Sequence, residues 1–331
     1  MSVAIRFMIK NMTLIKRFKD ITKSDVAIAG GKGASLGEMM RAGIPVPPGF
    51  VIVAGAFDRF LEESGLKEDI EARLKEARPD DVNSVEKASM TIRDAIHDRP
   101  MPEDLTAEIL RAFDTLGAEF VAVRSSATAE DSQIASWAGE LETYLNTTRD
   151  DVIDNVKMCW SSLFTPRAIF YRHEKNLIDH DVSVAVVIQK MAQSDVSGVA
   201  FTVHPVTEDP DQMIIEAAFG LGEAIVSGQV TPDSYIVRKS DMTMLDVRVG
   251  QQRRKIERSE DQKIKANRWI ELSEEAGGRQ KLTGRQIIEV AKMCKQIEEH
   301  YGFPCDIEWA MEKGKLFVTQ SRPITTLSRK V

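Results

Sequence analysis

The sequence contains only three cysteines, and none of them forms a CxxC pair, which argues against a disulfide framework or a zinc site. Isolated thiols of this kind are typical of reduced, mostly buried residues. No apolar run approaches the ~20 residues that a membrane helix needs. Arg6 and Lys10 interrupt the mildly apolar N-terminus, and no small-residue cleavage site follows it, so a signal peptide is not indicated. We therefore expect a soluble, cytoplasmic protein.

An excess of positive charge is also missing. The 331 residues include 44 basic and 51 acidic side chains, for a formal net charge of −7. This balance argues against general nucleic-acid binding, although it leaves room for a local basic pocket. Internal repeats and low-complexity segments are absent. The length exceeds that of the commonest single domain, so two or three lobes that share a cleft are expected.

Two common phosphate-binding motifs are absent from the glycine-rich stretch "AGGKGASLGEM", which covers residues 29–39. A Walker A loop needs a glycine where Val26 stands, and the glycine spacing does not fit G-x-G-x-x-G. Backbone N–H groups at the start of the following helix, expected over 33–43, can nevertheless bind an anion, and Lys32 can add a charge. A plain glycine turn with a solvated lysine is the alternative.

A second candidate is Arg124, which we expect to end a strand over 120–123 and to open the loop "SSATAEDSQIASWAG". A loop this long within a compact domain is usually functional or disordered. Its small hydroxyl side chains can bind phosphate oxygens, and an arginine can bind a phosphate through two hydrogen bonds. The alternative is a surface ion pair between Arg124 and Glu130 or Asp131.

The third candidate is a hairpin over residues 303–324, "FPCDIEWAMEKGKLFVTQSRPI". Asp306 and Glu308 are two residues apart in one strand, and Gln320 and Arg322 are two apart in the other. Residues two apart in a strand share a face. Carboxylate and amide oxygens are suitable ligands for Mg²⁺, and an arginine beside them suits phosphate. The alternative is a solvent-exposed face with cross-strand ion pairs.

The turn decides whether these two polar pairs share one face. A two-residue turn, Lys313-Gly314, would place Glu308 opposite Thr319 and turn Gln320 to the other side. A three-residue turn over 312–314, with its glycine left-handed, would place Asp306 opposite Gln320 and Glu308 opposite Val318. We predict the three-residue turn, which collects all four polar side chains on one face.

The remaining pattern mixes helices and strands without regular βαβ alternation, which indicates an α+β fold. We expect helices over 54–64, ending at Gly65, and over 284–301, with Thr283 as the N-cap. Residues 67–116 and 150–174 are also expected to be helical, and the charged segment 258–283 to be mobile or helical. The strands are expected near 49–53, 142–146, 182–191, 197–203, 212–219, 233–239 and 244–250.

Taken together, five blocks resemble the N-terminal nucleotide-binding domain of phosphoenolpyruvate synthases and pyruvate phosphate dikinases. They occur in the family's order and span nearly the whole chain. The blocks are "GGKGASLGEMMRAGIPVPPGF", "VAVRSSATAEDSQIASWAGELETYLN", "SGVAFTVHPVT", "EAAFGLGEAIVSGQVTPD" and "IEWAMEKGKLFVTQSRPIT".

The resemblance implies an ATP-grasp fold, in which two α+β lobes clamp ATP between antiparallel sheets, with an N-terminal helical elaboration. It implies one lobe over 1–190, with the glycine-lysine segment and the Ser/Thr loop, and one over 191–331, with the metal-binding hairpin. It also implies a Mg²⁺-dependent phosphotransferase. In this family ATP pyrophosphorylates a histidine on a swivelling domain, and later steps carry a phosphoryl group to pyruvate.

The resemblance also implies roles for individual residues. The implied catalytic residues, which contact the phosphates, are Lys32, Arg124 and Arg322, and the implied Mg²⁺ ligands are Glu308 and Gln320. The implied nucleotide-binding residues are Lys32, Arg124, Thr143, Gln189, Lys190, Met191, Glu216, Asp306 and Arg322, of which 189–191 match the hinge that meets adenine.

None of the five histidines lies in a glycine-rich segment that ends in Thr-Ser-His, the family's acceptor pattern. The chain alone is therefore expected to bind ATP and Mg²⁺ without completing phosphoenolpyruvate synthesis, with the histidine supplied by a separate domain or subunit. Two alternatives remain: part of an antibiotic kinase similar to rifampin phosphotransferase, or a non-catalytic nucleotide-binding regulatory module.

Overall fold

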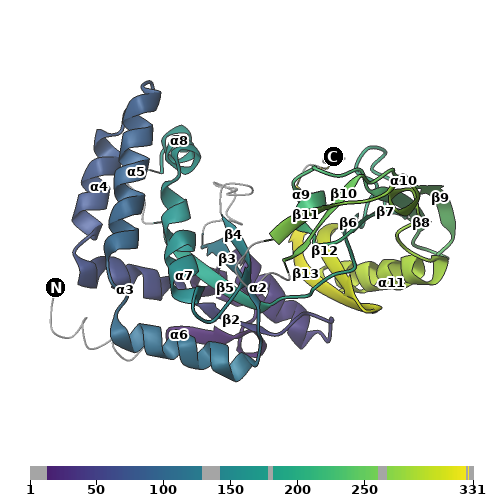
Figure 1. Cartoon of the computed structure of the whole chain (residues 1–331), viewed down its shortest axis with the longest axis horizontal. Helices are drawn as coiled ribbons and strands as arrows, with labels where there is room; N and C mark the ends of the chain where they lie inside the picture. Colours follow the sequence, from purple (N-terminus) through teal and green to yellow (C-terminus); the bar gives the residue numbers. More distant parts are fainter. Residues whose placement is uncertain (1–12, 129–141, 178–181, 260–266, 326, 328–331) are drawn as a thin grey trace. The chain divides into compact units, whose positions relative to one another are not determined.

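The structure is a computed structural model that describes residues 13–128, 142–177, 182–259, 267–325 and 327 (Figure 1). The chain divides into two compact units. The first consists of Met1–Glu38 and Pro48–Met191, and the second of Met39–Pro47 and Ala192–Val331. The short segment Met39–Pro47 belongs to the second unit, where the Val318 N–H donates to the Pro45 carbonyl at 2.9 Å. The predicted division into residues 1–190 and 191–331 does not assign Met39–Pro47 to the second unit.

A five-stranded antiparallel sheet forms the centre of the first unit, in the order β1-β2-β5-β3-β4. The strands are β1 (Ile15–Arg17), β2 (Gly49–Ile52), β3 (Val121–Ala127), β4 (Thr143–Thr147) and β5 (Val184–Lys190). The helices are α2 (Val26–Arg41), which continues into the second unit, α3 (Ala54–Ser64), α4 (Lys67–Glu76), α5 (Val82–Asp98), α6 (Glu103–Leu116), α7 (Val152–Ser161) and α8 (Pro166–Glu174). Short 3₁₀ turns cover Phe18–Asp20, Lys23–Asp25 and Ser162–Phe164.

The core of the first unit lies between one face of this sheet and the helices. Alternate strand residues such as Phe50 and Val123 are buried in this core. The ring of Trp160 in α7 packs against that of Phe57 in α3, with 5.5 Å between the ring centroids. The predicted helix over 54–64 is confirmed. It ends at Gly65, whose φ of 69° is left-handed, a conformation that glycine adopts at little cost.

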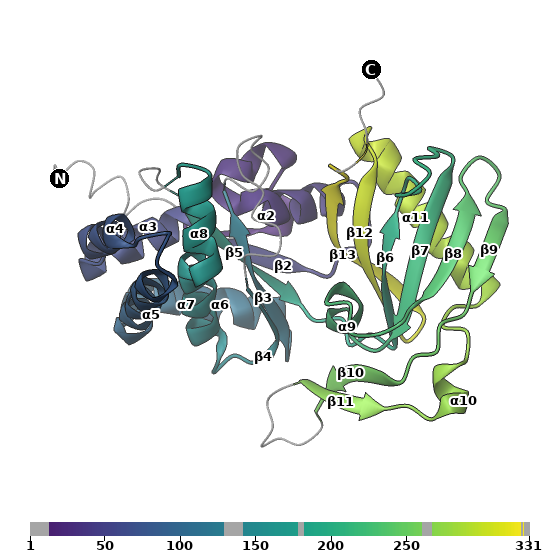
Figure 2. The same cartoon turned by 90° about the horizontal axis from the view of Figure 1, so that it is seen from above.

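The second unit contains a six-stranded antiparallel sheet in the order β13-β12-β6-β7-β8-β9 (Figure 2). Its strands are β6 (Val196–Phe201), β7 (Gln212–Phe219), β8 (Asp233–Arg238), β9 (Met244–Arg248), β12 (Cys305–Glu312) and β13 (Lys315–Pro323). A separate two-stranded sheet pairs β10 (Arg254–Arg258) with β11 (Asn267–Glu271), and the helices are α9 (Glu223–Val226), α10 (Glu274–Gly277) and α11 (Gly284–Tyr301).

Helix α11 covers one face of the six-stranded sheet and buries an apolar stripe that includes Ile287, Val290 and Cys294. The predicted N-cap is confirmed, because the Thr283 side chain accepts from the Gln286 N–H and forms a capping box. The segment 258–283 was expected to be mobile or helical. Its described part instead contains β11 and the short α10, and residues 260–266 lie outside the described residues. All three cysteines are free and buried, as predicted.

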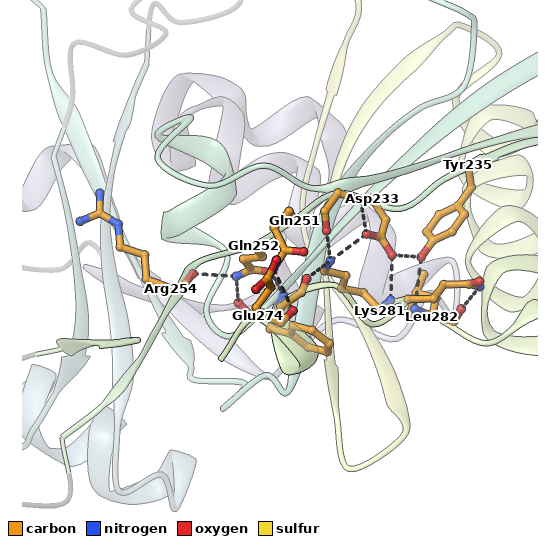
Figure 3. Close-up of polar contacts among 12 residues, drawn as sticks. Asp233, Tyr235, Gln251, Gln252, Arg254, Glu274, Lys281 and Leu282 are labelled. Atoms are coloured by element: carbon orange, nitrogen blue, oxygen red, sulfur yellow. Dashed lines mark hydrogen bonds and ion pairs between the residues drawn. The ribbon is translucent and has the colours of Figure 1, made fainter. Parts of the chain in front are cut away.

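A buried ion pair joins the segment after α10 to the start of β8 in the large sheet (Figure 3). Lys281 Nζ lies 2.9 Å from Asp233 Oδ1, and neither side chain is exposed. The Tyr235 hydroxyl and the Lys281 N–H donate to Asp233 Oδ2 at 2.6 and 2.8 Å. Lys281 Nζ also donates to the carbonyls of Gly250 and Gly277. The network has its charges and hydrogen bonds satisfied, as a buried ion pair requires.

Candidate functional site

In the first unit, the glycine-lysine segment is tied directly to β3. Helix α2 is kinked at Gly30, which has φ 66° and ψ 171°. A Cβ atom at this position would lie 2.1 Å from the Ser126 hydroxyl, so only glycine fits. The Ser126 hydroxyl donates to the Ala29 carbonyl at 3.0 Å and accepts from the Gly33 N–H at 3.4 Å. These contacts hold the turn that carries Lys32 beside the strand that carries Arg124.

Arg124 lies in the middle of β3, not at its end, so the expectation that it opens a loop is wrong. Seven consecutive residues of β3 are buried, and the strand continues through Ser125 and Ser126 because β5 pairs with it along its length. Thr143 of β4 lies directly opposite Arg124 in the register, so the two residues share a face. Residues 129–139 of the Ser/Thr loop, with both suggested acidic partners of Arg124, lie outside the described residues.

The predicted adenine-binding residues follow one another at the end of β5. Gln189 is 2% exposed and lies opposite Ala122 of β3 and Gly49 of β2. Its Nε2 atom has no hydrogen-bond partner within the described part of the chain. Lys190 is exposed and Met191 half-buried, and their N–H groups donate to the carbonyls of Pro48 and Phe120. A buried amide without a partner is unusual and is consistent with a site that a ligand completes.

In the second unit, the hairpin turn differs from the prediction. The strands β12 and β13 pair as far as Glu312 opposite Lys315, so the turn is the two-residue Lys313-Gly314, and both residues have positive φ, 49° and 76°. This is the geometry of a type I′ turn, which matches the twist of the strands. The three-residue turn and the Asp306–Gln320 and Glu308–Val318 pairs are therefore wrong.

A β-bulge restores the polar cluster that this turn alone would have divided. The register shifts at Glu308 and Trp309, which lie opposite Gln320 and Val318, so Thr319 is the extra residue. Asp306 lies opposite Arg322. Directly opposed residues share a face, and so do residues two apart, so Asp306, Glu308, Gln320 and Arg322 lie on one face, away from α11.

The same face continues across the sheet to Glu216. In the register, Glu308 lies opposite Val199 of β6, which lies opposite Glu216 of β7, so the Cα atoms of the two glutamates are about 10 Å apart at the usual strand spacing. Burial raises the pKa of Glu216. Burial is the sole cause of this shift, with no contribution from a charged or hydrogen-bonding side chain. Glu216 is thus on the face of the hairpin cluster but not adjacent to Glu308.

Asp306 and Arg322 form an ion pair at the end of the cluster. Arg322 Nε and Nη2 lie 2.9 and 2.8 Å from Asp306 Oδ2. Burial raises the pKa of Asp306, and the nearby Arg322 offsets this only in part. Half of the Arg322 side chain remains exposed. Its guanidinium can therefore contact a further anion while it neutralises Asp306.

Glu308 and Gln320 lie directly opposite each other, and their side chains carry oxygen atoms of the kind that can bind a metal ion. No group of three or more His, Cys, Asp or Glu side chains among the described residues could by itself hold a metal ion. Two oxygen donors from the protein fit Mg²⁺, which usually keeps several water or phosphate ligands. They would not fit a structural metal that needs a full set of protein ligands.

The link through Ser126 was not found in the sequence. Ser126 lies two residues after Arg124 in the strand, but it and Gly30 are almost one hundred residues apart, and a serine at this position does not indicate the contact. The glycine at position 30 was the only available signal, since a glycine before a helix can mark a close approach of two backbones.

The family described as "Pyruvate phosphate dikinase, AMP/ATP-binding domain" matches residues 26–331. The chain therefore belongs to the pyruvate phosphate dikinase AMP/ATP-binding domain family. Its mixed helices and antiparallel sheets are consistent with an α+β nucleotide-binding domain. Within the part of the chain that the structure describes, no helix is long and apolar enough to cross a membrane.

Several archaeal proteins are similar to nearly the whole chain. A probable phosphoenolpyruvate synthase of Archaeoglobus fulgidus is 46% identical over 94% of this chain and 41% of its own length. One of Methanocaldococcus jannaschii is 44% identical over 96% of this chain and 27% of its own length. The phosphoenolpyruvate synthase of Pyrococcus furiosus is 42% identical over 95% of this chain and 44% of its own length. The chain thus spans less than half the length of these relatives.

Proposed function

We propose that this chain is the nucleotide-binding part of a Mg²⁺-dependent dikinase of the phosphoenolpyruvate synthase type. The observation that carries the proposal is the hairpin cluster, in which two oxygen ligands and an Asp–Arg pair share one face of a sheet. The cluster occurs in a chain of an AMP/ATP-binding family. We further propose that the two units are the two lobes of an ATP-grasp fold.

In this proposal each unit contributes charge to the triphosphate. Lys32 and Arg124 of the first unit and Arg322 of the second would bind phosphate oxygens and balance their charge. Phosphoryl transfer depends mainly on positioning and charge stabilisation, so a protein nucleophile is not required in this part. Glu308 and Gln320 would hold Mg²⁺, which when bound would supply positive charge to balance the phosphates.

The adenosine moiety would bind through other groups. Gln189, whose buried Nε2 has no partner within the described residues, would bind the base together with the backbone of Lys190 and Met191. Thr143, Glu216 and Asp306 complete the proposed nucleotide site. The acceptor would be a histidine of a swivelling domain, in the same polypeptide or in another one. Pyruvate would react only through that domain, which accords with the larger length of the relatives.

Calorimetric titration of the chain with ATP, with and without Mg²⁺, tests the metal ligands. The Glu308→Ala variant is expected to weaken Mg²⁺–ATP binding at least about tenfold, a loss of about 1.4 kcal/mol or more. The matched control is Glu312→Ala, a glutamate of the same strand about 13 Å away. Unchanged affinity in Glu308→Ala, or equal losses in both variants, would refute the site.

A further inference from the structure

The two edges of the six-stranded sheet differ in how they are covered. At one edge, β13 has a backbone partner in the second unit, because the Val318 N–H donates to the Pro45 carbonyl. At the other edge, β9 pairs only with β8 among the described strands (Figure 2). An uncovered edge strand presents backbone groups that can pair with another strand.

Exposed apolar side chains are concentrated at this open edge. Nine large hydrophobic residues are exposed in the described part of the chain, and four of them lie in the six residues 244–249. They are Met244, Leu245, Val247 and Val249, each between 38% and 46% exposed. Scattered exposed apolar residues are normal, whereas a contiguous group marks an interaction surface.

The backbone of β9 has a free direction for pairing. The Val247 N–H donates to the Asp246 side chain of its own strand, at 2.9 Å. The Arg248 guanidinium donates to the other oxygen of the same carboxylate at 2.8 Å. The Val247 N–H therefore points along the outer edge of the sheet, where a carboxylate currently occupies the place of a neighbouring carbonyl.

The sequence of β9 is complementary to itself. In an antiparallel pair of two copies centred on Val247, Asp246 of each copy lies opposite Arg248 of the other. On the opposite face of the two paired strands, Leu245 of each copy lies opposite Val249 of the other copy. The two Val247 residues meet on the two-fold axis. Opposite charges and apolar residues that face each other across strands stabilise such a pair. The two Asp246–Arg248 pairs would replace the ion pair that each copy makes within its own strand.

We propose that β9 is a self-association surface, through which two copies of this chain join their six-stranded sheets edge to edge. The pairing is short, because the register between β8 and β9 is irregular between Ile236 and Val237, which bends the strand near Leu245. The contact extends over about five residues per copy, so the dimer is weak and depends on protein concentration. The proposal is independent of the nucleotide site.

Charge-reversal variants at Asp246 and Arg248 test whether two copies associate through β9 and not through another surface. Sedimentation equilibrium of the full chain is expected to show a reversible monomer–dimer equilibrium. Asp246→Arg or Arg248→Asp places like charges opposite each other twice per dimer and should weaken the dimer about tenfold. The double variant Asp246→Arg with Arg248→Asp exchanges the charges and should restore it. Arg279→Glu, a reversal in an exposed ion pair of another segment, is the control and should have no effect.

Thiol cross-linking provides a second measurement. The three native cysteines are buried, so a short bismaleimide should join two copies only through an introduced thiol. Val247→Cys should give cross-linked dimers, whereas Val206→Cys, at an even more exposed position, should not. A chain that is monomeric at all concentrations, or a dimer that neither single reversal weakens, would overturn the proposal. Equal cross-linking of both cysteine variants would do the same.

Discussion

Two acid–base pairs of the second unit carry the same charges in opposite surroundings. Asp233 and Lys281 are both fully buried, and each has several further hydrogen bonds besides the ion pair. Asp306 and Arg322 lie at the edge of the same sheet, with the Asp306 side chain 13% exposed, the Arg322 side chain 50% exposed, and the pKa of Asp306 raised. The difference indicates that the first pair holds the fold, whereas the second leaves a guanidinium accessible to the ligand proposed above.

The largest effect is expected from Lys281→Met. Removal of one partner leaves the Asp233 carboxylate buried without its counter-charge, which should lower the free energy of unfolding by about 3–5 kcal/mol. The matched control is Lys295→Met, since Lys295 pairs with Glu299 on the surface of α11 and should contribute less than about 1 kcal/mol. Denaturant unfolding measures both, and similar losses in the two variants would remove the distinction between buried and exposed pairs.

A smaller loss is expected from Tyr235→Phe, which removes the hydroxyl that donates to Asp233. A hydrogen bond to a charged group contributes about 1.5–3 kcal/mol. Burial and the adjacent Asp233 raise the pKa of Tyr235, so the folded protein keeps this proton when the unfolded chain loses it near pH 10. The wild-type protein should therefore lose stability as the pH rises above about 10, and Tyr235→Phe should lose less. Equal pH slopes in urea unfolding would contradict the assignment.

The smallest effect on stability is expected from Arg322→Ala, which tests the other side of the comparison. Because the Arg322 side chain is half exposed, its ion pair should contribute less than about 1 kcal/mol to the free energy of unfolding. ATP affinity should nevertheless fall about tenfold, since the guanidinium is proposed to bind phosphate. Lys315→Ala, on the same strand and also exposed, is the control for calorimetry. A large loss of stability without a loss of affinity would assign Arg322 to the fold.

The local elements were predictable because their signals are local. The helix that ends at Gly65 and the helix capped by Thr283 follow from a few adjacent residues, and both are confirmed. The position of Arg124 was wrong because the polar "RSS" after an apolar run suggested a strand end. Pairing with β5 and β4 keeps these residues in the sheet, and tertiary contacts override local polarity there.

The hairpin shows the same limit in more detail. The sequence indicated a hairpin and its four polar residues, but the expected turn was wrong. Two errors compensate, since the two-residue turn moves Gln320 to the other face and the bulge at Thr319 moves it back. A bulge depends on how both strands pack against their neighbours, so the local sequence of one hairpin does not specify it.

The sequence by itself determined the family, the chemical types at the candidate site and most of the helices and strands. These depend on residue identity and on short periodic patterns. Only the tertiary structure decided that Ser126 holds the Gly30 turn, that Thr319 is the extra residue of the hairpin, and that Asp233 and Lys281 are buried together. Each of these depends on contacts between segments distant in the chain, and the free energy of such contacts exists only once the sheets have formed.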